Sequence, residues 1–201
     1  MTVVLLVVVV VIALAAVVAV LVTRSRAGGG GRRPGGRTAR VDPLMGTASP
    51  AGDPHHIGVG DVIAYDGHDW VVRGSVSYDQ RGYRWAEHLL DRVGEQFWLS
   101  VEEDEQLQLV RWQAVRAATL EPTATVQWEG ATFELEERGQ ARFRAEGTTG
   151  MAPEGEVEYH DYEAPDGRLL SFERTGDTTF EVSVGEPIAP GAMTIFPGTG
   201  A

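Results

Sequence analysis

Hydrophobic and polar positions follow two different patterns along the chain. From Val3 to Val22 every residue is Val, Leu, Ile or Ala, without one polar side chain. As an α-helix that rises about 1.5 Å per residue, such a run spans roughly 30 Å, the thickness of the hydrocarbon core of a bilayer. Inside lipid, only a helix satisfies the backbone of a single segment. The run therefore predicts one transmembrane helix, and we assign residues 1–23 to this membrane anchor.

From Ile57 onward, apolar and charged residues alternate in short runs. In Phe133–Glu136, for example, one face is apolar and the other is charged. A period of two is what an antiparallel strand with one solvated face requires. Asp66-Gly67, a favoured dipeptide of tight hairpins, separates two such runs. The pattern predicts an all-β soluble domain over residues 56–187, with a short helix between Leu109 and Leu120 as a local alternative.

The two halves of this alternating region resemble each other. Ile63–Trp70 matches Val126–Phe133 in its pattern of apolar, polar and turn residues. Self-similarity of this kind indicates an internal duplication. We expect about five strands in each of two pseudo-repeated antiparallel meanders, which cover residues 57–118 and 123–187. Their apolar faces would pack together as a sandwich or close into one barrel.

Glycine and proline are abundant before and after the predicted domain. Residues 24–55 form a predicted flexible linker, and residues 188–201 form a predicted disordered tail, because such segments bury too little apolar surface to offset the entropy of ordering. Arginines next to the anchor are expected to lie at the surface of an anionic membrane. These four are Arg24, Arg26, Arg32 and Arg33.

The charges along the chain are distributed unevenly. All 17 basic residues are Arg, and from Val41 onward there are 11 of them against 29 acids, a difference of −18. A domain this acidic is expected to repel nucleic acid. The chain has no Cys, which excludes disulfides and thiolate metal sites.

The arginines after the helix also predict the orientation of the chain in a membrane. Two residues, Met1 and Thr2, precede the apolar run, and no cleavage pattern follows it, which indicates an uncleaved anchor. By the positive-inside rule, the N-terminus lies outside and the domain lies at the cytoplasmic face of the inner membrane. An exported domain is the alternative.

Three segments of the domain resemble a known bacterial family. They are Val59–Tyr65, Gly82–Leu90 and Phe97–Glu103. Their W-x-E and W-L-S-x-E motifs, in that order, are similar to those of the domain-of-unknown-function 4178 family. The resemblance covers about Ile57 to Val184. It implies a context of envelope-stress and small membrane-protein genes, and it implies no assigned activity and no catalytic residues.

Two acids are the candidate site residues of the domain. Glu87 shares a strand face with Trp85, and the repeat alignment places Asp161 opposite Glu87, beside Tyr159. Two inward carboxylates beside aromatic rings are suited to binding a cation or an amine, or to acid–base chemistry with a raised pKa. The alternative is that each acid pairs with an Arg or a backbone N–H, as buried charges usually must.

Other candidates indicate no further chemistry. His88 and His160 neighbour the two acids but point to the opposite strand face, and no spacing typical of a metal site is present, so we expect no metal and no cofactor. Ser100 and Ser171 lack the strained turn of a nucleophile and are interpreted as ordinary strand residues. Trp98 lies opposite the apolar face of its strand, so we expect it to be exposed and to mark a protein contact.

These observations support two hypotheses. The first is a membrane-tethered, non-enzymatic binding or scaffold module that recruits a protein partner at the cytoplasmic face of the inner membrane, in envelope maintenance or stress response. The second is a β-domain that binds a small cationic ligand, or acts on one as an enzyme, through Glu87 and Asp161.

Overall fold

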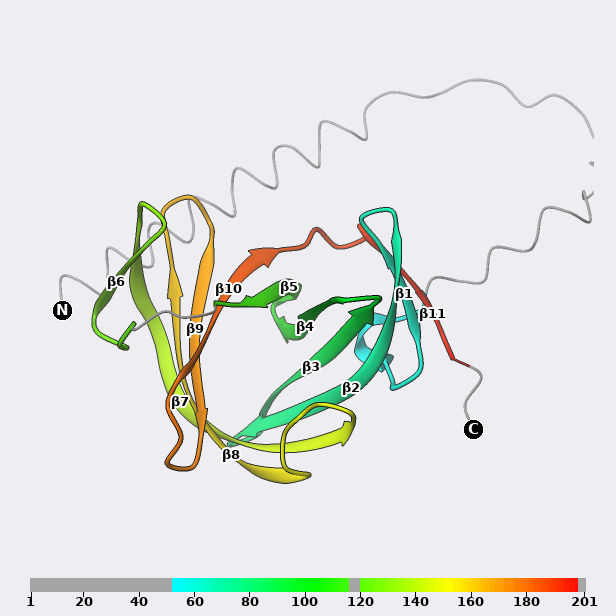
Figure 1. Ribbon diagram of the computed structural model, residues 1–201, viewed down its shortest axis with the longest axis horizontal. Helices are drawn as coiled ribbons and strands as arrows, with labels where there is room; N and C mark the ends of the chain where they lie inside the picture. Colours follow the sequence, from blue (N-terminus) through cyan, green and yellow to red (C-terminus); the bar gives the residue numbers. More distant parts are fainter. Residues whose placement is uncertain (1–51, 116–119, 199–201) are drawn as a thin grey trace, which may run out of the picture. The chain divides into compact units, whose positions relative to one another are not determined.

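The computed structural model describes residues 52–115 and 120–198 (Figure 1). The predicted transmembrane helix, nearly all of the predicted linker and its four membrane-surface arginines lie outside these residues. In the part of the chain that the structure describes, no helix has the length and apolar character needed to cross a bilayer.

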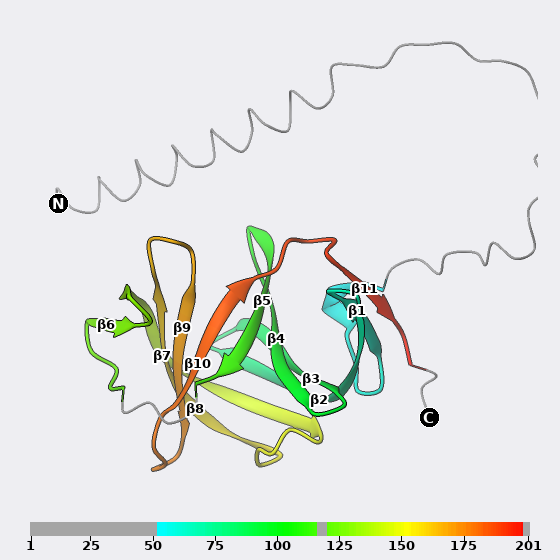
Figure 2. The same cartoon turned by 45° about the horizontal axis from the view of Figure 1, so that its top comes forward.

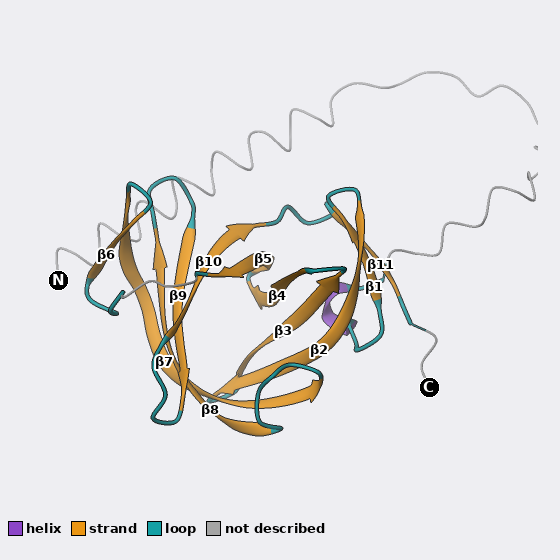
Figure 3. Ribbon diagram, viewed as in Figure 1, coloured by secondary structure: helices purple, strands orange, loops and turns teal. Residues whose placement is uncertain are grey.

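The described residues form strands and one short 3₁₀ helix, as Figure 3 shows. The elements are η1 (Pro54–His56), β1 (Val62–Tyr65), β2 (His68–Gln80), β3 (Tyr83–Arg92), β4 (Glu95–Asp104), β5 (Gln106–Ala114), β6 (Thr125–Trp128), β7 (Ala131–Gly147), β8 (Glu154–Glu163), β9 (Leu169–Thr175), β10 (Glu181–Pro187) and β11 (Met193–Phe196). The prediction of an all-β domain is therefore confirmed. The alternative of a short helix between Leu109 and Leu120 is wrong for residues 109–114, which belong to β5, while residues 116–119 lie outside the described residues.

The strands form one antiparallel sheet that is partly closed on itself. Its order is β11-β1-β2-β3-β4-β5-β10-β9-β8-β7-β6, and β2 pairs with β7 in addition to β3. This extra pairing joins β2, β3, β4, β5, β10, β9, β8 and β7 into a ring, while β1, β11 and β6 lie outside it (Figures 1 and 2). The predicted arrangements are a sandwich and a closed barrel, and the structure shows a sheet that forms a partial ring.

The ring consists of two similar meanders, β1 to β5 and β6 to β10. Each meander has a β-bulge at the same place in its second strand, between Val72 and Gly74 in β2 and between Leu135 and Glu137 in β7. The ladders that join the meanders, β2–β7 and β5–β10, connect strands at the same position in each half. Pairing between such strands is what a twofold relation between the halves requires.

The strand registers correct the predicted alignment of the two halves. Val72 pairs with Leu90, and the corresponding Leu135 pairs with Tyr162. The residue that corresponds to Glu87 is therefore Tyr159 and not Asp161, a difference of two positions. Because side chains alternate with a period of two, a shift of two leaves every side chain on its face, and the pattern alone does not detect it.

Apolar side chains gather in three clusters. One cluster covers the outer face of the first meander and includes Leu99 and Ile195, and a second covers the outer face of the other meander and includes Phe172. A smaller third cluster lies within the ring and includes Val76 and Phe143. Because the two larger clusters lie on the outer faces, the interior of the ring has room for polar side chains.

The segment after Pro187 differs from its prediction as a disordered tail. β11 pairs with β1, and Ile188 and Ile195 are both buried. The backbone N–H of Gly198 donates a 2.7 Å hydrogen bond to the buried carboxylate of Asp61. The run Met193–Phe196 has too few residues for its alternation to stand out between the prolines and glycines of the tail.

Candidate functional site

The interior of the ring brings together carboxyl groups from β3 and from the neighbouring pair β8 and β9 on the other meander. Glu87 of β3, Asp161 of β8 and Glu173 of β9 line one hollow. Trp85 and Tyr159 line it as well, with their ring centroids 5.9 Å apart across the interior. The structure thus brings together the four residues selected from the sequence, which are Trp85, Glu87, Tyr159 and Asp161. Glu173 was missed, although it follows Ser171 on the same strand face.

Burial raises the pKa of all three carboxyl groups. The pKa of Glu87 rises to about 7, first because of burial and then because of the negative charge of Asp161. Burial raises the pKa of Asp161 to about 6. Burial also raises the pKa of Glu173 well above its ordinary value, and the nearby Glu87 adds to the shift. Each side chain keeps some accessible surface because it lines a hollow, while protein surrounds it on the other sides.

These acids have little to stabilise their negative charge. Glu87 accepts a 3.3 Å hydrogen bond from the hydroxyl of Tyr78, which in turn stacks on Trp85 at 4.9 Å. Among the described residues, no ion pair reaches Glu87, Asp161 or Glu173. The arginine partner that the sequence left open as an alternative is therefore not found within the described part of the chain. An unpaired buried carboxylate is costly, and such groups stay protonated or find a ligand.

A hydroxyl group at the same place lies beside the acids and accepts no hydrogen bond within the described part of the chain. Ser171 is 5% exposed and lines the hollow, its hydroxyl lowers the pKa of the adjacent Asp161, and no described residue donates a hydrogen bond to its Oγ. Buried polar atoms are usually hydrogen-bonded, so an unpaired one calls for an explanation. By contrast, Ser100 accepts a 3.0 Å hydrogen bond from the indole N–H of Trp112. The Ser171 oxygen, which accepts no hydrogen bond from a described residue, indicates room for a ligand that donates one.

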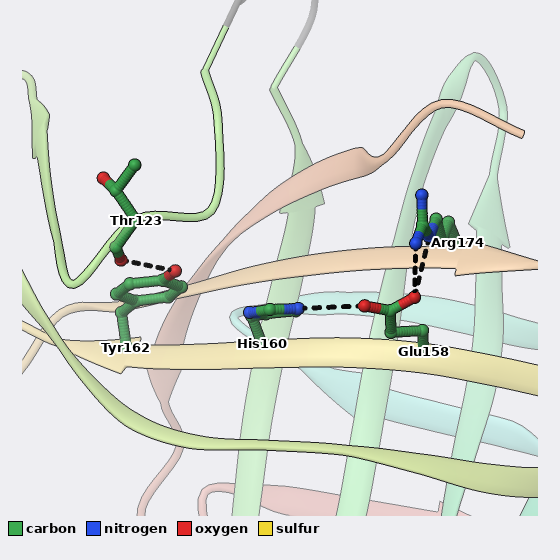
Figure 4. Close-up of polar contacts among 5 residues, drawn as sticks. All are labelled: Thr123, Glu158, His160, Tyr162 and Arg174. Atoms are coloured by element: carbon green, nitrogen blue, oxygen red, sulfur yellow. Dashed lines mark hydrogen bonds and ion pairs between the residues drawn. The ribbon is translucent and has the colours of Figure 1, made fainter.

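The opposite face of β8 shows how this protein treats a carboxylate that is kept ionised. Glu158 accepts two hydrogen bonds from the guanidinium of Arg174, at 2.8 and 2.6 Å, and lies 3.3 Å from His160 (Figure 4). Hydrogen bonds from Arg174 lower the pKa of Glu158. The two faces of β8 thus carry a paired carboxylate, Glu158, outside the ring and a carboxylate without an ion pair among the described residues, Asp161, inside it.

Two adjoining hollows share part of their lining. The one that holds all three acids has a volume of about 70 Å³. A second, of about 380 Å³, is lined by aromatic and apolar residues such as Trp98 and Met151 and by hydroxyl groups such as that of Thr178. Glu87, Trp112, Ser171 and Glu173 line both. More open grooves of about 940 and 900 Å³ lie elsewhere and contain none of the three acids.

The remaining candidates from the sequence are placed as follows. Trp98 is half-buried and packs against the interior cluster, so it is less exposed than expected, because the face opposite Leu99 is the interior of the ring; its role as a protein contact stays a prediction. His88 is buried, and its Nδ1 lies 2.8 Å from the Ser75 hydroxyl. Within the described ranges, no three His, Asp or Glu residues are arranged to hold a metal ion.

Comparisons with known proteins identify relatives but no activity. A family described as "Domain of unknown function (DUF4178)" matches residues 58–190. Uncharacterized proteins of Mycobacterium tuberculosis (Rv2597) and Mycobacterium bovis (Mb2628) are each 38% identical over 171 residues, covering 82% of this chain and 82% of the relative. The chain is homologous to these mycobacterial proteins. No solved structure matches it.

Proposed function

We propose that this chain, which belongs to the DUF4178 family, is a binding module that holds a small organic cation inside its ring of strands. The observation that carries this proposal is the set of three buried carboxyl groups, from three strands, that line a hollow without a positively charged partner among the described residues.

An organic cation supplies what these acids lack. A bound ammonium group pairs with the carboxylates and offsets the cost of their burial. The flat faces of Trp85 and Tyr159 attract a cation through their ring electrons, typically by about 0.5–2 kcal/mol. The hydroxyl oxygen of Ser171 accepts a hydrogen bond from the bound ammonium group. Aromatic walls around the acids favour an organic cation over a metal ion, which needs several convergent oxygen ligands.

Titration calorimetry with n-butylammonium chloride tests this proposal on the full chain in detergent micelles, in phosphate buffer at pH 7. We expect saturable binding, accompanied by release of protons, because pairing with the ammonium favours the ionised carboxylates. In Glu87→Gln the affinity should fall at least about tenfold, or 1.4 kcal/mol. Glu158→Gln is the matched control and should bind as the unaltered chain does. Absence of saturable binding by the unaltered chain would refute the proposal.

We also propose that this module is tethered to the inner membrane, with the domain at its cytoplasmic face. The apolar run Val3–Val22 and the arginines after it support this placement. Val93, at the tip of the β3–β4 hairpin, is 99% exposed, and the chain has no Cys. Val93→Cys should therefore resist a membrane-impermeant maleimide in intact cells and react after permeabilisation. Labelling in intact cells contradicts the cytoplasmic placement.

A non-enzymatic scaffold role at the membrane, in envelope maintenance or stress response, rests on the same tether. The acidic domain supports a basic protein partner. Crosslinking in living cells followed by purification compares the full chain with a chain that lacks residues 1–23. A protein recovered with the anchored form alone supports recruitment at the membrane. The same recovery with both forms contradicts a role for the tether.

A further inference from the structure

The two hollows inside the ring differ in size and in the chemistry of their walls. The narrow one, of about 70 Å³, has room for roughly two groups of the size of water, whose share of liquid volume is about 30 Å³. The wide one, of about 380 Å³, has room for a body of several carbon atoms. Glu87, Trp112, Ser171 and Glu173 line both hollows, so the two spaces adjoin each other at the acids.

The narrow hollow is suited to a compact positive group. Five of the residues that line it are acids and none is basic; the acids are Glu87, Glu102, Glu137, Asp161 and Glu173. Glu137 already accepts a 2.8 Å hydrogen bond from the Tyr159 hydroxyl, and Glu102 accepts one from Tyr83. Glu87, Asp161 and Glu173, together with Ser171, are the groups that can contact a ligand. A primary ammonium carries three N–H donors on one small atom, which suits several acceptors around a narrow space.

The wide hollow has mixed walls, and its aromatic residues offer contacts to an apolar group. The walls include the rings of Tyr78, Trp98 and Trp112 and the side chains of Met151 and Val157, together with the hydroxyl groups of Thr149, Thr175, Thr178 and Ser183. The charged residues that line it apart from the shared acids are Arg174 and Glu181, one of each sign. An apolar body that enters this space is removed from water, which favours binding.

We infer that the ligand is a primary amine with an apolar body, whose ammonium group lies among Glu87, Asp161 and Glu173 while its body packs against Trp98, Trp112 and Met151. This inference rests on the proposed function and narrows it. A quaternary ammonium head is too bulky for the narrow hollow and has no N–H to donate. A second positive charge at the far end of the ligand would lose hydration beside the rings of Trp98 and Trp112, and Arg174 in the same wall would repel it.

A ligand series in calorimetry tests the inference on the full chain in detergent micelles. The probes are methylammonium, n-butylammonium, n-butyltrimethylammonium and butane-1,4-diammonium. We expect n-butylammonium to bind most tightly, because each buried methylene contributes about fourfold in affinity. The quaternary compound should bind at least about tenfold more weakly than n-butylammonium.

Variants separate the two hollows. Met151 lies in the β7–β8 connection, is half-buried and packs against the interior cluster, so Met151→Ser should lower the thermal unfolding midpoint modestly and leave the protein folded. This variant should weaken n-butylammonium severalfold and leave methylammonium unchanged. Val93→Ser, at the exposed tip of another hairpin, is the control and should change neither affinity.

Each outcome discriminates between the two proposals. If the quaternary compound binds as tightly as n-butylammonium, the compact head is refuted while cation binding stands. If methylammonium or the diammonium equals n-butylammonium, the apolar body is refuted while cation binding stands. If no probe binds the unaltered chain, both the inference and the proposed function fail.

Discussion

Replacing Asp161 with Asn should stabilise the unliganded protein at neutral pH. Burial raises the pKa of Asp161 from 3.8 to about 6, a rise of about two units. One unit corresponds to about 1.4 kcal/mol, so an ionised Asp161 lowers the free energy of unfolding by about 3 kcal/mol. Asparagine has nearly the same shape and carries no charge, and it removes this cost.

The raised pKa of Asp161 also determines how the free energy of unfolding changes with pH. Between about pH 3.8 and 6 the folded state holds the proton on Asp161 while the unfolded state has released it. The free energy of unfolding therefore falls as pH rises through this window, and this loss is absent in Asp161→Asn. The variant and the unaltered protein should be equally stable near pH 3.5 and should differ by about 3 kcal/mol at pH 7.

Urea unfolding followed by tryptophan fluorescence measures this difference, in phosphate buffer because amine buffers are potential ligands. Glu158→Gln is the comparison, since hydrogen bonds from Arg174 lower the pKa of Glu158. Its stabilising contribution is present above pH 4.5 and is lost as pH falls through the lowered pKa. Glu158→Gln should therefore destabilise the protein at pH 7. If Asp161→Asn is also destabilising at pH 7, the carboxylate is compensated and the reasoning is refuted.

Three further predictions concern the surroundings of the ring. Ile195→Ala should cost about 2–5 kcal/mol in urea unfolding, because Ile195 is buried, whereas a disordered tail would give no change. A Cβ on Gly185 would lie 2.6 Å from the ring of Trp112, so Gly185→Ala should cost about 1–3 kcal/mol and shift the tryptophan fluorescence; an unaltered spectrum and stability would contradict this packing. Burial lowers the pKa of His88 to about 4, so its ring should stay neutral in an NMR titration until about pH 4, and the free energy of unfolding should decrease as pH falls from 6.5 toward 4; titration near pH 6.5 would be inconsistent with this burial.

The amino-acid sequence by itself determined the fold class and the faces of the strands. Alternation of apolar and polar residues is a local property, since it depends on the period of two within each strand. It placed Glu87 with Trp85, and Asp161 with Tyr159, on one face of their strands, and the structure brings all four to one hollow. The similarity of the two halves likewise indicated two meanders before their pairing was known.

Tertiary structure decided the properties that depend on distant segments. A shift of two residues between the repeats leaves every face unchanged, so the strand ladders alone show that Glu87 corresponds to Tyr159. Closure of the ring through β2–β7 placed Trp98 on the interior face of the sheet. It also brought three separate carboxyl groups into one buried cluster. Burial and mutual repulsion raise the pKa values of these carboxyl groups. Both effects arise when strands that are far apart in the sequence face each other, and the local sequence pattern does not show which strands do so.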